Sequence, residues 1–426
     1  MTAHDRPGWR PGTDHAAALA APGVRVVMDL RPLQDPDRAP LTAGYLEALL
    51  GALNDDPQPE ESFSFLLAAD LDDPSTRWPN LTVVGTRHLP PTRLLRSGAL
   101  TVDPFVLRGA SIGAGWRAER EGAAGTVYHA AAGGLPIASG IPVVASLLDL
   151  APWSMPEAYQ SGTVARFGQR LRSRLFRDAA AVLVPSRATA AEARRLLRVR
   201  KARLRVVPLA ARAAYRPEAA AGAARERERL GLGERYAVYA GRYDARQDLP
   251  TLFAALASLA AEDRPATVEE GSWPPRVCLV GATPGDRAAV SRAAVRAGVA
   301  DSIAYAPRLP EGRLAALVAG ARFLVQPVRS EASGIAALDA LAAAVPVVAS
   351  SIGALPEVVG AAGILVEPGD PARLATAIRA VWADDALHEG LVAAARERTE
   401  GARTWADVAR ETRAVWAEVA RPAPIL

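Results

Sequence analysis

Short apolar runs that alternate with helix-like segments constrain this chain more than any other feature. They cover residues 24–30, 63–69, 81–84, 126–129, 141–148, 181–184 and 204–207, and then residues 236–240, 277–280, 303–306, 323–326, 347–349 and 364–366. Strands that are apolar along their whole length are typical of parallel sheets with helices on both faces. The alternation predicts an α/β fold with two Rossmann-like, doubly wound parallel-sheet domains.

The length of 426 residues fits two domains of about 200 residues each. We expect a flexible tail at residues 1–23, a first domain at 24–215 and a second at 216–400, joined through the connection 208–217. Trp405 and Trp416 lie on one stripe of a final helix within residues 401–426. That face is expected to be buried, either on the second domain or back across the first.

Composition excludes several classes of protein. The net charge of +4 is small, and arginine is used almost to the exclusion of lysine, so arginine clusters give little support for nucleic-acid binding. The single cysteine, Cys278, excludes an intrachain disulfide or a site built from several thiolates. We find neither a signal-peptide pattern nor an apolar run that would span a membrane, so a cytoplasmic location is expected.

Residues 330–339 contain the most suggestive chemistry. Glu331 falls in the loop between the strand 323–327 and a helix expected at 337–344, and Asp339 lies on that helix. Free backbone N–H groups at a helix start suit a phosphate, and Gly334 would let an anion approach the backbone. The two acids could accept hydrogen bonds from sugar hydroxyls. The alternative is a plain apolar βαβ unit with one acid at its helix start.

Other candidates lie where strands end, because ligands of doubly wound sheets bind at the carboxyl ends of the strands. The loop 31–44 follows the first strand and precedes a helix at 45–53. His129 ends a strand before a glycine-containing loop, and Asp149 ends the next strand. Arg242 follows Gly241 at a strand end, a position suited to a diphosphate. A structural histidine and a surface arginine are the alternatives.

Two further segments have competing interpretations. Residues 164–177 show helical apolar spacing (Val164, Phe167, Leu171, Leu175) opposite a row of arginines. This pattern indicates either a peripheral helix on an anionic membrane or an ordinary amphipathic surface helix. Asp70 and Asp72 match a metal-binding acid pair, but turn residues follow directly, and we expect no metal there.

Several of these motifs together resemble glycosyltransferase family 4, which has the GT-B fold, and its branch of O-antigen-type mannosyltransferases. The matching segments, in chain order, are 28–34 with Gly44-Tyr45, Tyr128-His129, 206–208 with 215–217, Gly241-Arg242, Glu331 with Asp339, 355–358 and Trp405. The resemblance covers nearly the whole chain after Gly23. It implies two domains facing each other across a cleft.

The resemblance also implies a function: transfer of a hexose, with mannose as one candidate, from a nucleotide diphosphate sugar with retention at the anomeric carbon. No metal or other cofactor is implied. The acceptor would be a glycan or lipid-linked molecule in cell-envelope or polysaccharide biosynthesis. Nucleic acid is not an expected partner.

The family's roles carry over onto particular positions. Glu331 and His129 would be catalytic. The donor would contact the positions Arg242, Gln247, Arg308, Leu309, Ser333, Gly334, Ile335 and Asp339, with Asp339 at the ribose and Arg308 and Leu309 at the base. The acceptor would lie near Arg31, Gly44 and Asp149.

The chain departs from the family pattern around the same site. Asp339 replaces a glutamate, Gln247 replaces a lysine, and Leu148 replaces a histidine before Asp149. Gln247 supplies no charge to a diphosphate, although the neighbouring Arg246 could. Two hypotheses follow: an active retaining glycosyltransferase, or a degenerate GT-B protein that binds a nucleotide sugar or a partner without turnover.

Overall fold

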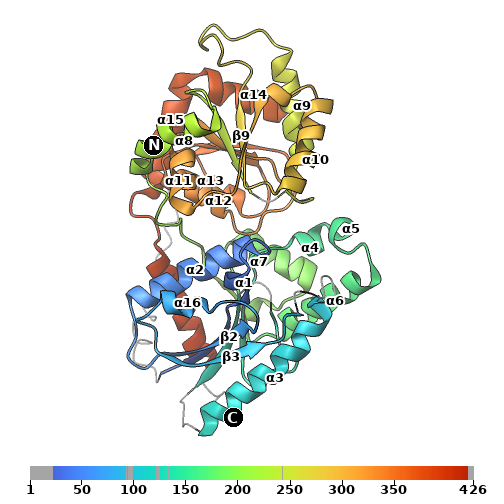
Figure 1. Cartoon of the computed structure of the whole chain (residues 1–426), viewed down its shortest axis with the longest axis vertical. Coiled ribbons are helices and arrows are strands. Elements are labelled where there is room, and N and C mark those ends of the chain that lie inside the picture. The colour runs from blue at the N-terminus through green and yellow to red at the C-terminus, as the bar shows by residue number, and fades with distance from the viewer. Residues whose placement is uncertain are drawn as a thin grey trace, which may run out of the picture.

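The computed structural model describes residues 23–92, 94, 99–120, 125–131, 134–241 and 243–420. These residues form two parallel sheets, each covered by helices on both faces (Figure 1). The first sheet has the strand order β3-β2-β1-β4-β5-β6-β7, and the second has the order β10-β9-β8-β11-β12-β13. This arrangement confirms the predicted fold class. The predicted tail falls almost wholly outside the described residues.

The first sheet and its helices occupy the N-terminal domain. Its strands are β1 (Arg25–Asp29), β2 (Ser62–Ala68), β3 (Val83–Leu89), β4 (Thr126–Ala131), β5 (Val143–Ser146), β6 (Ala181–Val184) and β7 (Leu204–Val206). Its α-helices are α1 (Arg31–Gln34), α2 (Pro40–Asp55), α3 (Ala99–Arg120), α4 (Ala151–Ser154), α5 (Pro156–Tyr159), α6 (Thr163–Asp178) and α7 (Arg187–Glu192).

The second sheet forms the C-terminal domain. Its strands are β8 (Ala237–Ala240), β9 (Val277–Val280), β10 (Ile303–Ala306), β11 (Phe323–Gln326), β12 (Val347–Ser350) and β13 (Gly363–Val366). The helices from here to the end of the described chain are α8 (Ala223–Leu230), α9 (Leu249–Ala260), α10 (Pro284–Arg296), α11 (Glu311–Ala319), α12 (Ile335–Ala342), α13 (Leu355–Val359), α14 (Pro371–Ala383), α15 (Asp385–Thr399) and α16 (Trp405–Ala420).

The central strands are apolar because both of their faces are covered. Every residue of β6, β9, β11 and β12 is buried. In the first domain, α2 packs on one face of the sheet, while α3 and α6 pack on the other. In the second, α11 and α12 cover one face, while α9 and α14 cover the other.

The last helix, α16, leaves the C-terminal domain and packs into the core of the N-terminal domain. Figure 1 shows it beside α2, far from α14 and α15. Val408, Val415 and Trp416 belong to the same buried cluster as the apolar residues of α2. Arg413 reinforces this contact through an ion pair with Glu61, with Nη2 and Oε2 3.0 Å apart. The chain therefore crosses between the domains twice.

The expected loop after the first strand is largely helical. Residues Arg31–Gln34 form α1, and α2 begins at Pro40 rather than at residue 45. Proline is favoured in the first turn of a helix, because its ring fixes φ and the missing N–H would have no intrahelical partner there. Leu33 and Ala43 are buried, so apolar packing holds the segment against the domain.

Candidate functional site

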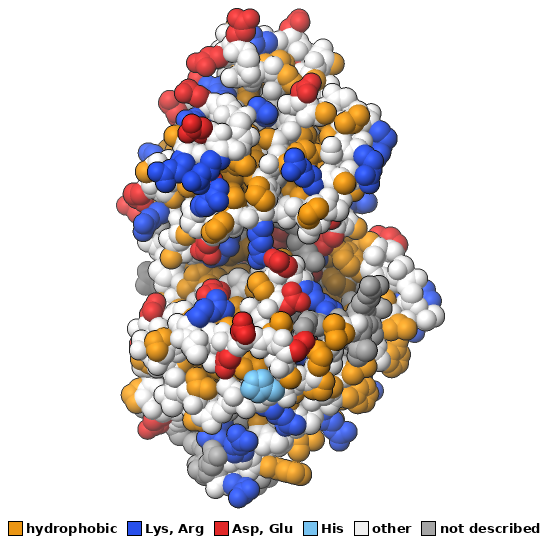
Figure 2. Space-filling view, in the orientation of Figure 1, with side chains coloured by type: hydrophobic (Ala, Val, Ile, Leu, Met, Phe, Trp, Pro, Cys, Tyr) orange, Lys and Arg blue, Asp and Glu red, His pale blue; other side chains and the backbone are white. Residues whose placement is uncertain are grey.

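A cleft of about 1170 Å³ separates the two domains, and residues of both line it. Figure 2 shows the hollow between the upper and lower halves of the molecule. The lining comes from α1, α2 and the segments after β5, β8, β9, β10 and β11. The carboxyl ends of both sheets therefore face one cavity, the position at which doubly wound sheets bind ligands.

Glu331 lies at the start of α12 and its carboxylate is held by four donors. Oε1 accepts from the N–H and Oγ of Ser333 and from the N–H of Gly334, at 2.9, 2.8 and 2.8 Å. Oε2 accepts from Nε2 of Gln326 at 3.0 Å. The acid is thus fixed in one orientation on the cleft wall.

This arrangement corrects the expected use of the helix start. The N–H groups near Gly334 and Ile335 were expected to face a phosphate, but the N–H of Gly334 donates to Glu331, as does that of Ser333. Gly334 has φ +67°, a conformation that glycine adopts without strain. Ser333 and Ile335 line the cleft, and the N–H of Ile335 has a single long contact, 3.5 Å, to Oγ of Ser333.

Asp339 also borders the cleft, but its carboxylate is taken by Arg212 of the connection between the domains. Oδ1 accepts from the backbone N–H of Arg212 at 2.9 Å, and Oδ2 accepts from Nε and Nη2 at 2.9 and 2.6 Å. Burial raises the pKa of Asp339 to about 6, against the opposing effect of Arg212. Sequence reasoning missed Arg212, because nothing near it in the chain marks its partner.

Two residues, Arg242 and Gln247, were expected near the diphosphate of the donor. Arg242 lies outside the described residues. Gln247 lines the cleft, and so does its neighbour Arg246, whose Nη2 lies 3.0 Å from Oδ2 of Asp149 across the domain boundary. Arg246 also pairs with Asp244 at 3.0 Å. Arg246 thus places a cation in the cleft beside the position where the family carries a lysine.

Of the residues expected near the base and the acceptor, all but Arg31 line the cleft. Arg308, Leu309, Gly44 and Asp149 line the cleft, and Arg308 forms an ion pair with Asp37 of the other domain. Arg31 was expected near the acceptor, but its guanidinium pairs with carboxylates of its own domain, Asp29 at 2.7 Å and Asp103 at 2.9 Å. We therefore interpret Arg31 as a structural residue of the N-terminal domain.

His129 does not lie in the cleft. It has no exposed surface; its Nδ1 accepts from Nε1 of Trp416 at 2.8 Å, and its Nε2 lies 3.0 Å from Oγ of Ser146. Burial lowers the pKa of His129 to about 3. An indole N–H only donates, so the neutral ring carries its proton on Nε2 and donates to Ser146. These contacts assign His129 a structural role in place of the expected catalytic one.

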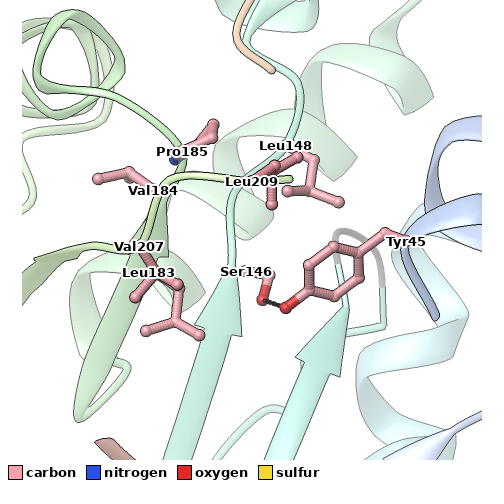
Figure 3. A pocket seen from close by; sticks show the side chains of 8 residues that line it. All are labelled: Tyr45, Ser146, Leu148, Leu183, Val184, Pro185, Val207 and Leu209. Carbon is pink, nitrogen blue, oxygen red and sulfur yellow. Dashed lines mark hydrogen bonds between the residues drawn. The ribbon is translucent and has the colours of Figure 1, made fainter. Parts of the chain in front are cut away.

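A small, mostly apolar cavity adjoins the cleft in the N-terminal domain. Figure 3 shows the side chains of Tyr45 and Ser146 pointing toward one another. Their hydroxyl oxygens lie 2.9 Å apart, and the cavity has a volume of about 10 Å³. Leu148, Leu183, Val184, Pro185, Val207 and Leu209 complete its lining. Leu148, where the family carries a histidine, borders both this cavity and the cleft. No proton-transfer group stands at that position.

Direct contacts tie the two domains together around the cleft. Oγ of Ser154 lies 3.0 Å from Oγ of Ser330, and Oγ1 of Thr189 donates to the carbonyl oxygen of Ala332 at 2.8 Å. Gly353 allows the Glu331 loop to approach closely: a Cβ there would lie 1.7 Å from the Glu331 carbonyl oxygen. The loop that carries Glu331 is thus packed from both sides.

Two parallel-sheet α/β domains that face each other across a cleft define the GT-B fold of glycosyltransferases. Sucrose-phosphate synthase from Thermosynechococcus elongatus superposes with a TM-score of 0.70 at 21% identity, over 93% of this chain and 98% of that one. The lipopolysaccharide glycosyltransferase WaaG gives 0.63 at 14% identity, over 92% and 98%. Anabaena HepE, solved with UDP and glucose, gives 0.62 at 16%, over 93% and 99%.

Two family models match the sequence. "Glycosyltransferase Family 4" matches residues 120–211, and "Glycosyl transferases group 1" matches residues 234–384. Each model covers less than half of the chain and falls on a different domain, so the chain is similar to glycosyltransferase family 4 in both halves.

Curated relatives agree with that family. The D-inositol 3-phosphate glycosyltransferase of Streptomyces avermitilis is 34% identical over 194 residues, 44% of this chain and 40% of that protein. The protein of the same name from Streptomyces bingchenggensis is 34% identical over 215 residues, 49% of this chain and 46% of that protein. The matches thus span less than half the length of these relatives.

Proposed function

We propose that this protein is a retaining glycosyltransferase that takes a hexose from a nucleotide diphosphate sugar. The observation that carries the proposal is the position of Glu331: a carboxylate held by four donors just before a helix start, with room for a further donor at Oε2, on the wall of a cleft of about 1170 Å³ between two GT-B domains. A sugar hydroxyl can donate to such a carboxylate without disturbing its other contacts.

Two arginines of the cleft are candidates for stabilising the leaving group. Arg246 and Arg308 line the cleft from the C-terminal domain. As the bond to the anomeric carbon breaks, negative charge develops on the departing diphosphate, and fixed cations stabilise that charge. Both arginines now pair with acids of the other domain, Asp149 and Asp37. Donor binding would therefore redistribute the contacts that hold the domains together.

For substrates, we propose a hexosyl donor and a glycan or lipid-linked acceptor in cell-envelope polysaccharide assembly. HepE is a structural relative solved with UDP-glucose, which supports a nucleotide sugar as ligand class. The resemblance to mannosyltransferases makes GDP-mannose the second donor to test. The acceptor side would be formed by Gly44 and Asp149, which line the cleft from the N-terminal domain.

We further propose a peripheral contact with anionic membrane through α3 and α6. No helix among the described residues is both long and apolar enough to cross a bilayer. Apolar and basic side chains are exposed on the two helices: Val164 (48% exposed), Phe167 (56%), Phe105 (55%) and Trp116 (68%), with Arg166, Arg170, Arg174 and Arg177. An exposed acid, Asp178, pairs with Arg174. Arg172, another arginine of α6, instead stacks on Trp153.

Vesicle flotation tests the membrane proposal. Exposed aromatic rings and arginines favour an anionic interface. We expect the protein to float with vesicles that contain phosphatidylglycerol and to remain in the bottom fraction when the vesicles are pure phosphatidylcholine. Equal recovery with both vesicles would contradict the proposal.

The function itself is tested with purified protein and a panel that includes UDP-glucose and GDP-mannose. We expect release of the nucleoside diphosphate from at least one donor, and loss of that release in Glu331→Ala. Glu367→Ala, an exposed acid that follows β13 and does not line the cleft, is the matched control and should keep full activity. Binding by calorimetry without turnover across the panel would instead identify a degenerate, nucleotide-sugar-binding protein.

A further inference from the structure

Two amide oxygens at the cleft are buried and have no hydrogen-bond partner among the described residues. They are Oε1 of Gln326, the last residue of β11, and Oε1 of Gln247, in the segment after β8. Both residues line the cleft. β8 and β11 are neighbouring strands, and Gln247 forms an antiparallel bridge with Val328. The two acceptors therefore belong to one small region of the C-terminal wall.

The orientation of the Gln326 amide is determined by its neighbour. Its Nε2 donates to Oε2 of Glu331 at 3.0 Å. An ionised carboxylate only accepts hydrogen bonds, so a flipped amide would set oxygen against oxygen. Gln326 is 5% exposed. Its Oε1 is therefore fixed as a buried acceptor that needs a donor.

The two amide oxygens are hydrogen-bond acceptors, so a ligand must bring donors to pair with them. The Gln326 oxygen lies beside the carboxylate of Glu331, and the Gln247 oxygen belongs to the same wall. Together they form a set of acceptors, which repels phosphate oxygens and attracts O–H donors. A buried polar group without a partner is costly, and the cost is recovered when a ligand supplies one. A polyol fits this set, and a sugar is the polyol that the proposed reaction brings here.

We propose that Gln326 and Gln247 recognise hydroxyl groups of the transferred sugar and so determine donor-sugar specificity. The inference rests on the proposed function. Gln326 also positions Glu331, while Gln247 recognises a hydroxyl from the position where the family has a cation. With Gln247 in place of the family's lysine, the site thus loses a charge for the diphosphate and gains an acceptor for the sugar.

Calorimetry with paired ligands tests this assignment. Wild type, Gln326→Leu and Gln247→Leu are each titrated with two ligand pairs. One pair is UDP and UDP-glucose, and the other is GDP and GDP-mannose. A site built to hydrogen-bond a hydroxyl discriminates strongly against its loss. We expect each variant to bind the sugar-carrying nucleotide about tenfold more weakly and the plain nucleoside diphosphate with unchanged affinity, since one hydrogen bond to the sugar is lost. Gln58→Leu, an exposed amide outside the cleft, should change neither affinity.

The results separate this inference from the function on which it rests. Equal weakening of both ligands would assign the glutamines a structural role and overturn the inference, as would no weakening at all. Binding of nucleotide sugar without turnover would refute the enzyme but leave this test intact, because its readout is affinity. Failure of wild type to bind any of the four ligands would overturn both proposals. Thermal unfolding of each variant is measured to check that the fold is retained.

Discussion

The guanidinium of Arg212 donates to Oδ2 of Asp339 through Nε and Nη2, at 2.9 and 2.6 Å. Arg212 lies in the connection between the domains, and Asp339 lies on α12 behind Glu331. The same guanidinium donates to the hydroxyl of Tyr215 at 2.9 Å. This ion pair fixes the connection between the domains to α12, so the acid expected at the ribose also holds that connection.

Loss of Arg212 should destabilise the protein more than loss of an exposed arginine nearby. Arg212→Ala leaves a carboxylate, 2% exposed, without its partner. Removing one member of a buried ion pair typically costs about 3–5 kcal/mol, and we expect the lower end because the Arg212 side chain is 25% exposed. Urea denaturation measures the change, with the exposed Arg216→Ala as control. A difference of under about 0.5 kcal/mol between the two variants would contradict the prediction.

His129 should make the fold sensitive to acid. Burial lowers its pKa from 6.5 to about 3, so the folded protein holds it neutral while the unfolded chain binds a proton below pH 6.5. Stability from this group is full above pH 6.5 and is lost as the pH falls toward 3. At pH 5 the loss is about 2 kcal/mol, at about 1.4 kcal/mol per pH unit.

The measurement is the free energy of unfolding at pH 7.5 and pH 5 for wild type and His129→Asn. The variant should lose less stability between the two pH values. Asp339 has a raised pKa and acts in the opposite direction below pH 6, but it is present in both proteins, so it cancels in the comparison. Identical pH dependence of wild type and variant would show that His129 does not titrate in this way.

Trp416 should be essential to the fold, whereas Trp116 should not. Trp416 is 1% exposed among residues of α2 and the first sheet, and replacing a buried tryptophan by alanine costs about 3–5 kcal/mol. Trp116 is 68% exposed, so Trp116→Ala should leave stability unchanged and weaken flotation with anionic vesicles. Thermal unfolding and flotation of both variants measure these effects, and a stable Trp416→Ala would refute the role given to α16.

Arg246 should contribute to binding of the nucleoside diphosphate itself. It lines the cleft with its side chain 11% exposed, where its charge is little screened. We expect Arg246→Leu to weaken binding of UDP or GDP by about tenfold or more, since a charge-assisted contact is lost. Arg292→Leu, an exposed arginine on α10, is the control. Unchanged diphosphate affinity in Arg246→Leu would place the phosphates elsewhere.

The fold followed from local sequence. Runs such as 277–280 and 323–326 are apolar throughout, and strands with that pattern have few architectures other than a covered parallel sheet. The position of Glu331 at a helix start was also predictable, because Gly334 and the apolar helix behind it are neighbours in the chain. The helical segment before α2 was missed, since proline and aspartate there indicate a turn as readily as a first helical turn.

The sequence by itself therefore determined the two sheets, their order along the chain and the acid at the cleft. The tertiary structure alone decided which polar groups are free to act. Arg212 is 127 residues from Asp339, and Trp416 is 287 residues from His129, so no local pattern records either pairing. The physical reason is that burial and hydrogen bonding are set by packing between distant segments. A side chain of the right chemical type at the right strand end, such as His129, can still be enclosed in the core.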